Sequence, residues 1–111
     1  MKYLLDTANL DEIRELCEYL PVAGVTSNPS IVKKEGAVPF FAHMREIRSI
    51  IGNVHPLHIQ VTATDYDGMM RDADAVFRHV DEKVYIKVPV DFAGVKVIKA
   101  LKRQGANVTA T

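Results

Sequence analysis

The sequence predicts an α/β protein with a parallel sheet, and three observations support this fold class. Short apolar segments rich in β-branched residues alternate with segments whose apolar residues recur every three or four positions, as in helices. The order is β-α-β-α-α-β-α-β-α-β, which is typical of parallel strands joined by right-handed crossovers. The 111 residues are 48% hydrophobic and 25% charged, the composition of an ordinary globular domain. With no low-complexity segment or internal linker in the sequence, we expect residues 1–111 to belong to one domain.

The first strand and helix are predicted close to the N-terminus. Residues 2–5 form a short strand, and Asn9 caps the helix that follows. Glu12, three residues after the cap, supplies the return half of a capping box. Pro21 ends the helix, and residues 22–25 form the second strand. The apolar positions of this helix share one face: Leu10, Ile13, Leu16, Cys17 and Leu20.

A helical turn and a longer helix precede the third strand. Residues 29–32 form the turn, with Pro29 at its first position, and Gly36 breaks it. Pro39 begins the longer helix and Gly52 ends it. The apolar residues of this helix are spaced by four, three and four positions: Phe40, Met44, Ile47 and Ile51.

The third strand covers residues 57–61, and Thr64 or Asp65 caps the helix after it. The expected buried face of that helix is Met69, Ala73, Val76, Phe77 and Val80.

The last elements are a strand at 84–90, a helix at 92–103 that Gly105 ends, and a fifth strand at 107–111. The residues expected to point inward from the last helix are Val95, Ile98 and Leu101.

One lysine interrupts the most apolar of these strands. Valine or isoleucine occupies every second position and shares one face: Val84, Ile86, Val88 and Val90. Lys87 lies on the other face, between Tyr85 and Pro89. Lysine is rarely buried without a partner or a function, and a desolvated, neutral amine attacks carbonyls and forms Schiff bases. The strand pattern alone leaves two interpretations open: a reactive buried lysine, or an edge-strand lysine that points to solvent.

Polar side chains recur at the carboxyl ends of the strands: Asp6, then Thr26 and Asn28, then Gln60 and Thr62, then Lys87, then Thr109 and Thr111. Active sites of (β/α)8 (TIM) barrels are built from such residues. A doubly wound nucleotide-binding sheet instead has a glycine-rich first turn, and the turn here, residues 6–9, has no glycine. No G-x-x-x-x-G-K sequence is present either. The barrel is therefore favoured, and the open doubly wound sheet is the alternative.

The chain is too short for a whole barrel. A complete (β/α)8 barrel takes roughly 250 residues, whereas about four and a half βα units are predicted here. An unpaired edge of apolar parallel strand is prone to aggregation. We therefore expect a half-barrel that is the first half of something longer or that pairs with another chain.

Composition excludes several function classes. The 14 basic and 14 acidic residues balance, so there is no basic surface typical of nucleic-acid binding. We expect no signal peptide and no membrane span. The single cysteine, Cys17, excludes an intrachain disulfide and favours a reducing, cytoplasmic setting. The four histidines show no metal-ligand spacing, although His55 and His58 are three residues apart, so we expect no metal site.

Several segments together resemble one enzyme family. They are Leu4-Leu5-Asp6-Thr7-Ala8 in the first strand, Gly24-Val25-Thr26-Ser27-Asn28-Pro29-Ser30-Ile31 after the second, Gln60-Val61-Thr62-Ala63 in the third, Ile86-Lys87-Val88-Pro89-Val90 in the fourth and Asn107-Val108-Thr109-Ala110-Thr111 in the fifth. The sequence resembles the N-terminal half of a transaldolase, in the small subfamily that includes fructose-6-phosphate aldolase. The G-V-T-S-N-P-S and K-V-P-V segments are highly specific in combination.

The resemblance implies a class I aldolase or transaldolase that needs no metal or other cofactor. Lys87 would form the Schiff base with the carbonyl of a ketose phosphate such as fructose 6-phosphate, and Asp6 would act as an acid/base group. Gln60 and Thr111 would hold the catalytic water. Thr26 and Asn28 would bind substrate hydroxyls.

The residue types also allow structural roles. Asp6 fits a helix N-cap, Thr26 a cap or turn, and Gln60 a polar position in the barrel layer. Asn28, before a proline, fits a turn. Thr109, on the same strand face as Thr111, ranks lower as a site residue.

The resemblance also implies a role in carbohydrate metabolism, including the pentose phosphate pathway. We expect a sugar phosphate as the small-molecule partner and a homo-oligomer, without nucleic-acid or membrane partners. The family chain is about twice this length, and its phosphate-binding residues lie in later strands.

Three alternatives remain at this point. The first is a truncated half-barrel that self-associates without catalysis. The second is a phosphosugar-binding barrel in which Lys87 anchors a phosphate and forms no Schiff base. The third is a flavodoxin-like cofactor-binding module.

Overall fold

A computed structural model describes residues 3–20, 22–27 and 39–111 of the chain. The described elements are β1 (Tyr3–Asp6), α1 (Leu10–Tyr19), β2 (Val22–Ser27), α3 (Phe40–Ile51), β3 (Leu57–Gln60), α4 (Tyr66–His79), β4 (Tyr85–Val88), α5 (Phe92–Arg103) and β5 (Val108–Ala110). These confirm the predicted alternation of strands and helices. The helical turn predicted at 29–32, the break at Gly36 and the site residue Asn28 lie outside the described residues.

The described strands form one parallel sheet in the order β1-β2-β3-β4-β5. Each strand pairs with the next one in the sequence, so the strand order never reverses. A doubly wound sheet requires such a reversal, and because every crossover here runs in the same sense, the helices collect on one side of the sheet. The fold is therefore the α/β architecture of a half-barrel.

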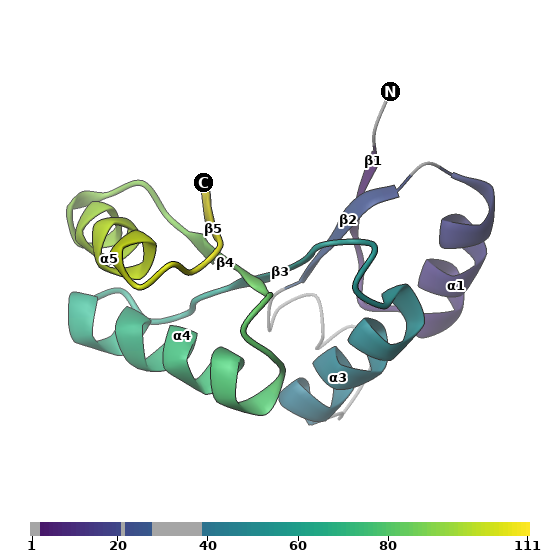
Figure 1. Ribbon diagram of the computed structural model, residues 1–111, viewed down its shortest axis with the longest axis horizontal. Helices are drawn as coiled ribbons and strands as arrows, with labels where there is room; N and C mark the ends of the chain where they lie inside the picture. Colours follow the sequence, from purple (N-terminus) through teal and green to yellow (C-terminus); the bar gives the residue numbers. More distant parts are fainter. Residues whose placement is uncertain (1–2, 21, 28–38) are drawn as a thin grey trace.

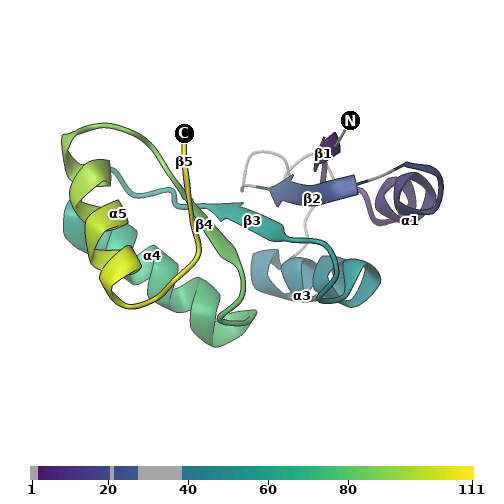
Figure 2. The ribbon, with the colours of Figure 1, turned by 45° about the horizontal axis from the view of Figure 1, so that its top comes forward.

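The sheet bends into an arc with the helices on its outside. Figure 1 shows α1, α3, α4 and α5 following one another around the convex side, while no described helix covers the concave side. The view in Figure 2 shows the same arrangement, with β1 and β5 at the two ends of the arc. The concave face is the side that becomes the interior of a closed barrel, and active sites of such barrels lie at the carboxyl ends of the strands, so the concave side chains near those ends matter most for function.

The core fills the space between the convex face and the helices. Alternate strand residues point into it and are nearly inaccessible to solvent: Leu5, Val25, Leu57, Ile59, Ile86 and Val88. The helices contribute the residues that pack on them: Ile13, Met44, Ile47, Ile51, Met69, Ala73, Val76, Val97 and Leu101. Each fully buried large aliphatic side chain contributes about 1.5–3 kcal/mol through removal of apolar surface from water. This layer supplies most of the stability of the described part of the fold.

Local sequence signals set the helix ends as predicted. Asn9 caps α1, because its side-chain oxygen accepts a hydrogen bond of 2.9 Å from the Glu12 backbone N–H. Asp65 is the residue at the N-cap position of α4. Gly52 and Gly105 follow α3 and α5 with φ of +62° and +80°, a left-handed conformation that favours glycine.

Thr7 takes part in the α1 cap in a way that was not predicted. Its hydroxyl oxygen accepts the Asn9 backbone N–H at 3.2 Å and donates to the Glu12 carboxylate at 3.4 Å. Thr7 therefore links the two halves of the predicted capping box.

The predicted bounds of β1, β3 and β5 differ from the observed ones by one residue at one or both ends, and larger details of the prediction were wrong. β2 continues to Ser27 instead of ending at residue 25, because Thr26 and Ser27 pair with β3. β4 ends at Val88, so Val90 is 62% exposed where the chain turns toward the α5 cap. Val95 is 52% exposed and Val97 is buried in its place. The buried face of α5 runs through Gly94, Val97 and Leu101, a spacing of three and four.

An ion pair ties α3 to the loop between α4 and β4. Arg48 Nε lies 2.7 Å from Asp81 Oδ2, and the two side chains are only 15% and 30% exposed. The same guanidinium donates to the carbonyls of Gly52 and His55. Arg48 thus connects loops that lead into β3 and β4. None of the helices described in residues 3–20 and 39–111 is long and apolar enough to cross a membrane.

Candidate active site

The concave face carries a row of polar side chains that comes from all five strands. The register aligns Asp6 with Thr26, Gln60 with Lys87, and Lys87 with Thr109. Their sequence neighbours on the same strands point into the core, so alternation turns these residues to the concave side. Residues far apart in the sequence are thereby gathered on one surface.

Asp6 and Thr26 form a fixed pair at the β1–β2 end of this row. The Thr26 hydroxyl donates a hydrogen bond of 2.8 Å to Asp6 Oδ1. Thr26 is 8% exposed, whereas Asp6 is exposed to solvent. The buried hydroxyl therefore orients a carboxylate that remains accessible to a substrate. For Asp6, the structure excludes the alternative role as the N-cap of the first helix, since the side chain of Asn9 caps α1.

Lys87 occupies the middle of a strand that has neighbours on both sides. β4 lies between β3 and β5, so the interpretation of Lys87 as an edge-strand lysine is wrong. The side chain is half-buried, with Gln60 opposite it on β3 and Thr109 opposite it on β5. A half-buried amine flanked by an amide and a hydroxyl is accessible to a small carbonyl compound from the concave side.

Thr62 and Thr111, two of the threonines predicted at the carboxyl ends of the strands, differ in their positions. Thr111 extends the β4–β5 pairing: its N–H donates to the Val88 carbonyl at 2.9 Å, and its carbonyl accepts from the Val90 N–H at 2.7 Å. Thr62 does not face the concave side, which corrects the prediction. Its backbone N–H and its hydroxyl bond to Asp72 Oδ2 of α4 at 2.9 and 3.3 Å. Asp72 thereby pulls this loop toward the helix layer.

His58 belongs to the row and was missed as a site residue. It precedes Gln60 by two positions on β3, so strand alternation was the signal that could have identified it. Its Nδ1 lies 2.8 Å from the Thr109 hydroxyl, and its ring lies 4.8 Å from that of Tyr85 at an angle of 30°. Burial lowers the pKa of His58 below the usual 6.5, and the positive charge of Lys87 lowers it further. In the sequence, His58 drew attention only through its spacing from His55, as a candidate metal ligand, and no metal site was expected.

Comparison with known proteins identifies the family. A sequence model described as Transaldolase/Fructose-6-phosphate aldolase matches residues 3–111. The chain belongs to this family.

Individual relatives agree with the family match. All 111 residues align at 47% identity with a probable fructose-6-phosphate aldolase of Streptococcus pneumoniae (strain ATCC 700669 / Spain 23F-1), covering 50% of that protein. They align at 41% identity with a probable transaldolase of Chelativorans sp. (strain BNC1), covering 49% of it, and at 38% with a probable transaldolase of Methanococcus vannielii, covering 50%. The chain therefore spans about half the length of these relatives, as the resemblance to an N-terminal half predicted.

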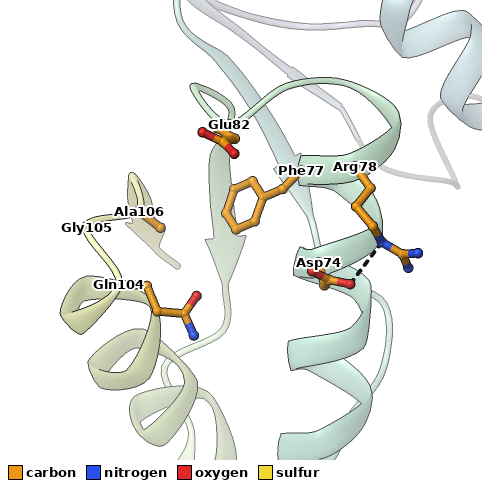
Figure 3. A pocket seen from close by; sticks show the side chains of 7 residues that line it. All are labelled: Asp74, Phe77, Arg78, Glu82, Gln104, Gly105 and Ala106. Carbon is orange, nitrogen blue, oxygen red and sulfur yellow. Dashed lines mark ion pairs between the residues drawn. The ribbon is translucent and has the colours of Figure 1, made fainter.

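The transaldolase/fructose-6-phosphate aldolase half-barrel also has a hollow on its convex side, remote from the polar row. Figure 3 shows the side chains that line this hollow, between α4 and the turn that follows α5. The volume of the hollow is about 440 Å³. Its lining consists of Asp74, Phe77, Arg78, Glu82, Gln104, Gly105 and Ala106. Arg78 and Asp74 form an exposed ion pair of 3.0 Å within α4, one turn apart. None of the predicted site residues lines this hollow.

The polar row combines groups suited to carbonyl chemistry. It contains an amine that can act as a nucleophile, a carboxylate that can accept or donate a proton, and uncharged hydroxyl and amide groups that can hold water or substrate hydroxyls. Among residues 3–20, 22–27 and 39–111, no three His, Cys, Asp or Glu side chains are grouped so that they could hold a metal ion.

Proposed function

We propose that this chain carries the Schiff-base lysine of a class I aldolase or transaldolase that acts on ketose phosphates such as fructose 6-phosphate. The reaction cleaves off or transfers a dihydroxyacetone unit. The observation that carries the proposal is the position of Lys87, half-buried on an internal strand within the polar row of the concave face. Membership of the transaldolase/fructose-6-phosphate aldolase family supports the same chemistry.

The proposed reaction begins at the Lys87 amine. Its neutral form attacks the C2 carbonyl, and loss of water from the resulting carbinolamine leaves an iminium ion. A base takes the proton of the C4 hydroxyl, the C3–C4 bond breaks, and its electron pair moves into the iminium to form an enamine. The enamine then takes up a proton, or it adds to a second aldehyde. Hydrolysis releases the product and regenerates the lysine, and the lysine nitrogen supplies the electron sink, so the scheme uses no cofactor.

The other predicted residues receive the following roles, and those of Asp6, Thr26, Gln60 and Thr111 fit their positions in the described part of the chain. Asp6 is the acid/base group, and its exposed carboxylate is oriented by the Thr26 hydroxyl. Gln60, aligned with Lys87 across β3 and β4, and Thr111, at the end of β5, hold the water that relays protons. Thr26 and Asn28 contact substrate hydroxyls.

Other proposals concern the setting of this chemistry. We propose a cytoplasmic enzyme that assembles as a homo-oligomer and serves carbohydrate metabolism, including the pentose phosphate pathway. A self-associating half-barrel without catalysis is less favoured, because the match to named enzymes runs through the entire chain.

Chemical trapping of the imine tests the proposal. The purified protein is incubated with dihydroxyacetone, reduced with borohydride and analysed by intact-mass and peptide mass spectrometry. A reduced Schiff base adds about 74 Da, since the carbonyl compound loses water and the imine gains two hydrogens. We expect this adduct on Lys87.

Two variants serve as controls for the trapping experiment. Lys87→Met removes the amine and is expected to abolish the adduct. Lys83→Met removes an exposed lysine just before the same strand and is expected to leave it unchanged. An unmodified Lys87 in the wild-type protein would contradict the proposal. Binding of a sugar phosphate that needs Lys87 but gives no trapped adduct would instead support the phosphate-anchor alternative.

A further inference from the structure

A hydrogen bond between two side chains crosses over β4 on the concave face. His58 belongs to β3 and Thr109 to β5, and β4 lies between these two strands. His58 Nδ1 nevertheless lies 2.8 Å from Thr109 Oγ1. We call this pair the His58–Thr109 bridge. The residues are 51 positions apart in the sequence, so only the curvature and register of the sheet bring them together.

The imidazole ring of the bridge is held from two sides. Tyr85 of β4 stacks against it, with ring centroids 4.8 Å apart and an angle of 30° between the planes. On the β2 side, Gly24 leaves room for the ring. A Cβ atom at position 24 would lie 3.3 Å from His58 Nε2 and 2.8 Å from the Pro56 carbonyl oxygen. The ring therefore has one well-defined place on the concave face.

The bridge lies beside Lys87. Thr109 is directly opposite Lys87 in the β4–β5 register, and Tyr85, which holds the ring, precedes Lys87 by two residues on the same face. The positive charge of Lys87 lowers the pKa of His58, in addition to the effect of burial. Both effects favour the neutral form of the His58 imidazole.

Within residues 3–20, 22–27 and 39–111, the ionisable groups that act on or touch the ring come from β4: Tyr85 and Lys87. Thr26, which is opposite His58 on β2, is uncharged and donates its hydroxyl hydrogen bond to Asp6 of β1. The residues of β2 and β5 on this face next to the ring, Gly24 and Thr109, carry no charge.

We propose that the His58–Thr109 bridge positions the Lys87 side chain for Schiff-base formation, an inference that rests on the proposed function. A free lysine side chain has four rotatable bonds, and ordering it costs up to about 2 kcal/mol. A rigid bridge beside the stem removes many of the unproductive rotamers before substrate arrives, and so raises the rate of attack. His58 and Thr109 are positioning residues in this scheme, because they act through Lys87.

Substitutions of the two bridging residues test the bridge. His58→Phe keeps a ring that can stack on Tyr85 and removes the hydrogen bond, and Thr109→Val removes the hydroxyl at nearly constant volume. The double variant tests whether the two residues act as a unit. His55→Phe is the matched control, since it makes the same substitution three residues earlier and outside β3. Circular dichroism and thermal unfolding establish that each variant is folded.

The main readout is the rate of the borohydride-trapped Lys87 adduct as a function of dihydroxyacetone concentration. We expect each single variant to lower the maximal rate by about tenfold. The maximal rate of the double variant should lie within about twofold of that of the slower single variant. The half-saturating concentration should change by less than about twofold. His58→Asn, which keeps a polar atom near the place of Nδ1, should restore part of the rate. Folded His58→Phe and Thr109→Val proteins with wild-type rates would overturn the proposal.

A second readout does not depend on catalysis. The pKa of His58, followed by NMR of the imidazole protons, should rise in Lys87→Met because the neighbouring positive charge is lost. An unchanged value would show that the bridge does not face Lys87 and would overturn the inference. Complete absence of a Lys87 adduct in the wild-type protein is a different result, because it overturns the proposed function itself.

Discussion

The two faces of the sheet use the same strands for opposite purposes. On the convex face, Val25, Ile59 and Ile86 are at most 1% exposed and pack under the helices. On the concave face, the next residues along these strands, Thr26, Gln60 and Lys87, are polar. Because side chains alternate in a strand, one residue step separates the hydrophobic core from the candidate active site.

The polar face is organised by hydrogen bonds, and the apolar face by packing. The Thr26 hydroxyl bonds to Asp6 on the neighbouring strand, and His58 bonds to Thr109 across the intervening strand β4. Hydrogen bonds constrain the orientation of the side chains that they join, whereas close packing constrains the size and shape of the apolar side chains that fit the core. We therefore expect substitutions on the convex face to lower the unfolding free energy and substitutions on the concave face to lower Schiff-base formation.

The sharpest test of this contrast uses two adjacent residues of β4. Ile86→Ala removes a fully buried side chain and is expected to destabilise the protein by about 3 kcal/mol through lost burial and a residual cavity. Lys87→Met is expected to change stability by less than about 1 kcal/mol while abolishing the trapped adduct. Urea unfolding and borohydride trapping measure the two effects. A large loss of stability in Lys87→Met would contradict the expectation that concave residues contribute little to the unfolding free energy.

A second test compares two ion pairs on the helix side. Arg48→Met leaves Asp81 partly buried without its cation, so we expect a loss of about 1–3 kcal/mol. Arg78→Met removes an exposed pair, in which both side chains are more than half exposed, and should cost less than about 0.5 kcal/mol. Both values come from urea unfolding. Equal costs for the two variants would mean that burial does not set the strength of these pairs.

A third and smaller effect concerns the helix cap after β1. Asn9→Ala removes the acceptor of the Glu12 backbone N–H and should lower the unfolding free energy by about 1 kcal/mol. Asn9→Asp keeps an acceptor and should retain most of the stability. The measurement is again urea unfolding, and an Ala variant as stable as the Asp variant would argue against the cap.

The smallest expected effect is the pH dependence that His58 contributes. Its folded-state pKa is lower than the usual 6.5, so the unfolded chain binds a proton first as the pH falls. The contribution of His58 leaves the unfolding free energy unchanged well above pH 6.5, lowers it as the pH falls below that value, and levels off below the folded-state pKa. Unfolding curves of the wild type and His58→Phe at about pH 7.5 and about pH 5 measure this contribution. If the unfolding free energy falls equally on acidification in both proteins, His58 does not contribute to the pH dependence.

Much of the fold and part of the site could be predicted from local patterns. The spans of α1, α3 and α5, the Asn9 cap and the glycines that end α3 and α5 depend on residues only a few positions apart, so the sequence contains the relevant interactions directly. The same holds for the position of Lys87 on the face opposite Ile86 and Val88, which follows from the two-residue period of a strand.

Sequence by itself therefore determined the order of the elements, the ends of the helices and the alternation of side chains between the two faces of each strand, because these properties are local. The tertiary structure decided how the strands are aligned and curved. It paired Thr26 with Asp6 over 20 residues and His58 with Thr109 over 51, and it turned Thr62 toward Asp72 of α4. These contacts depend on strand register and sheet curvature, which the packing of whole helices against the sheet sets and no single segment encodes.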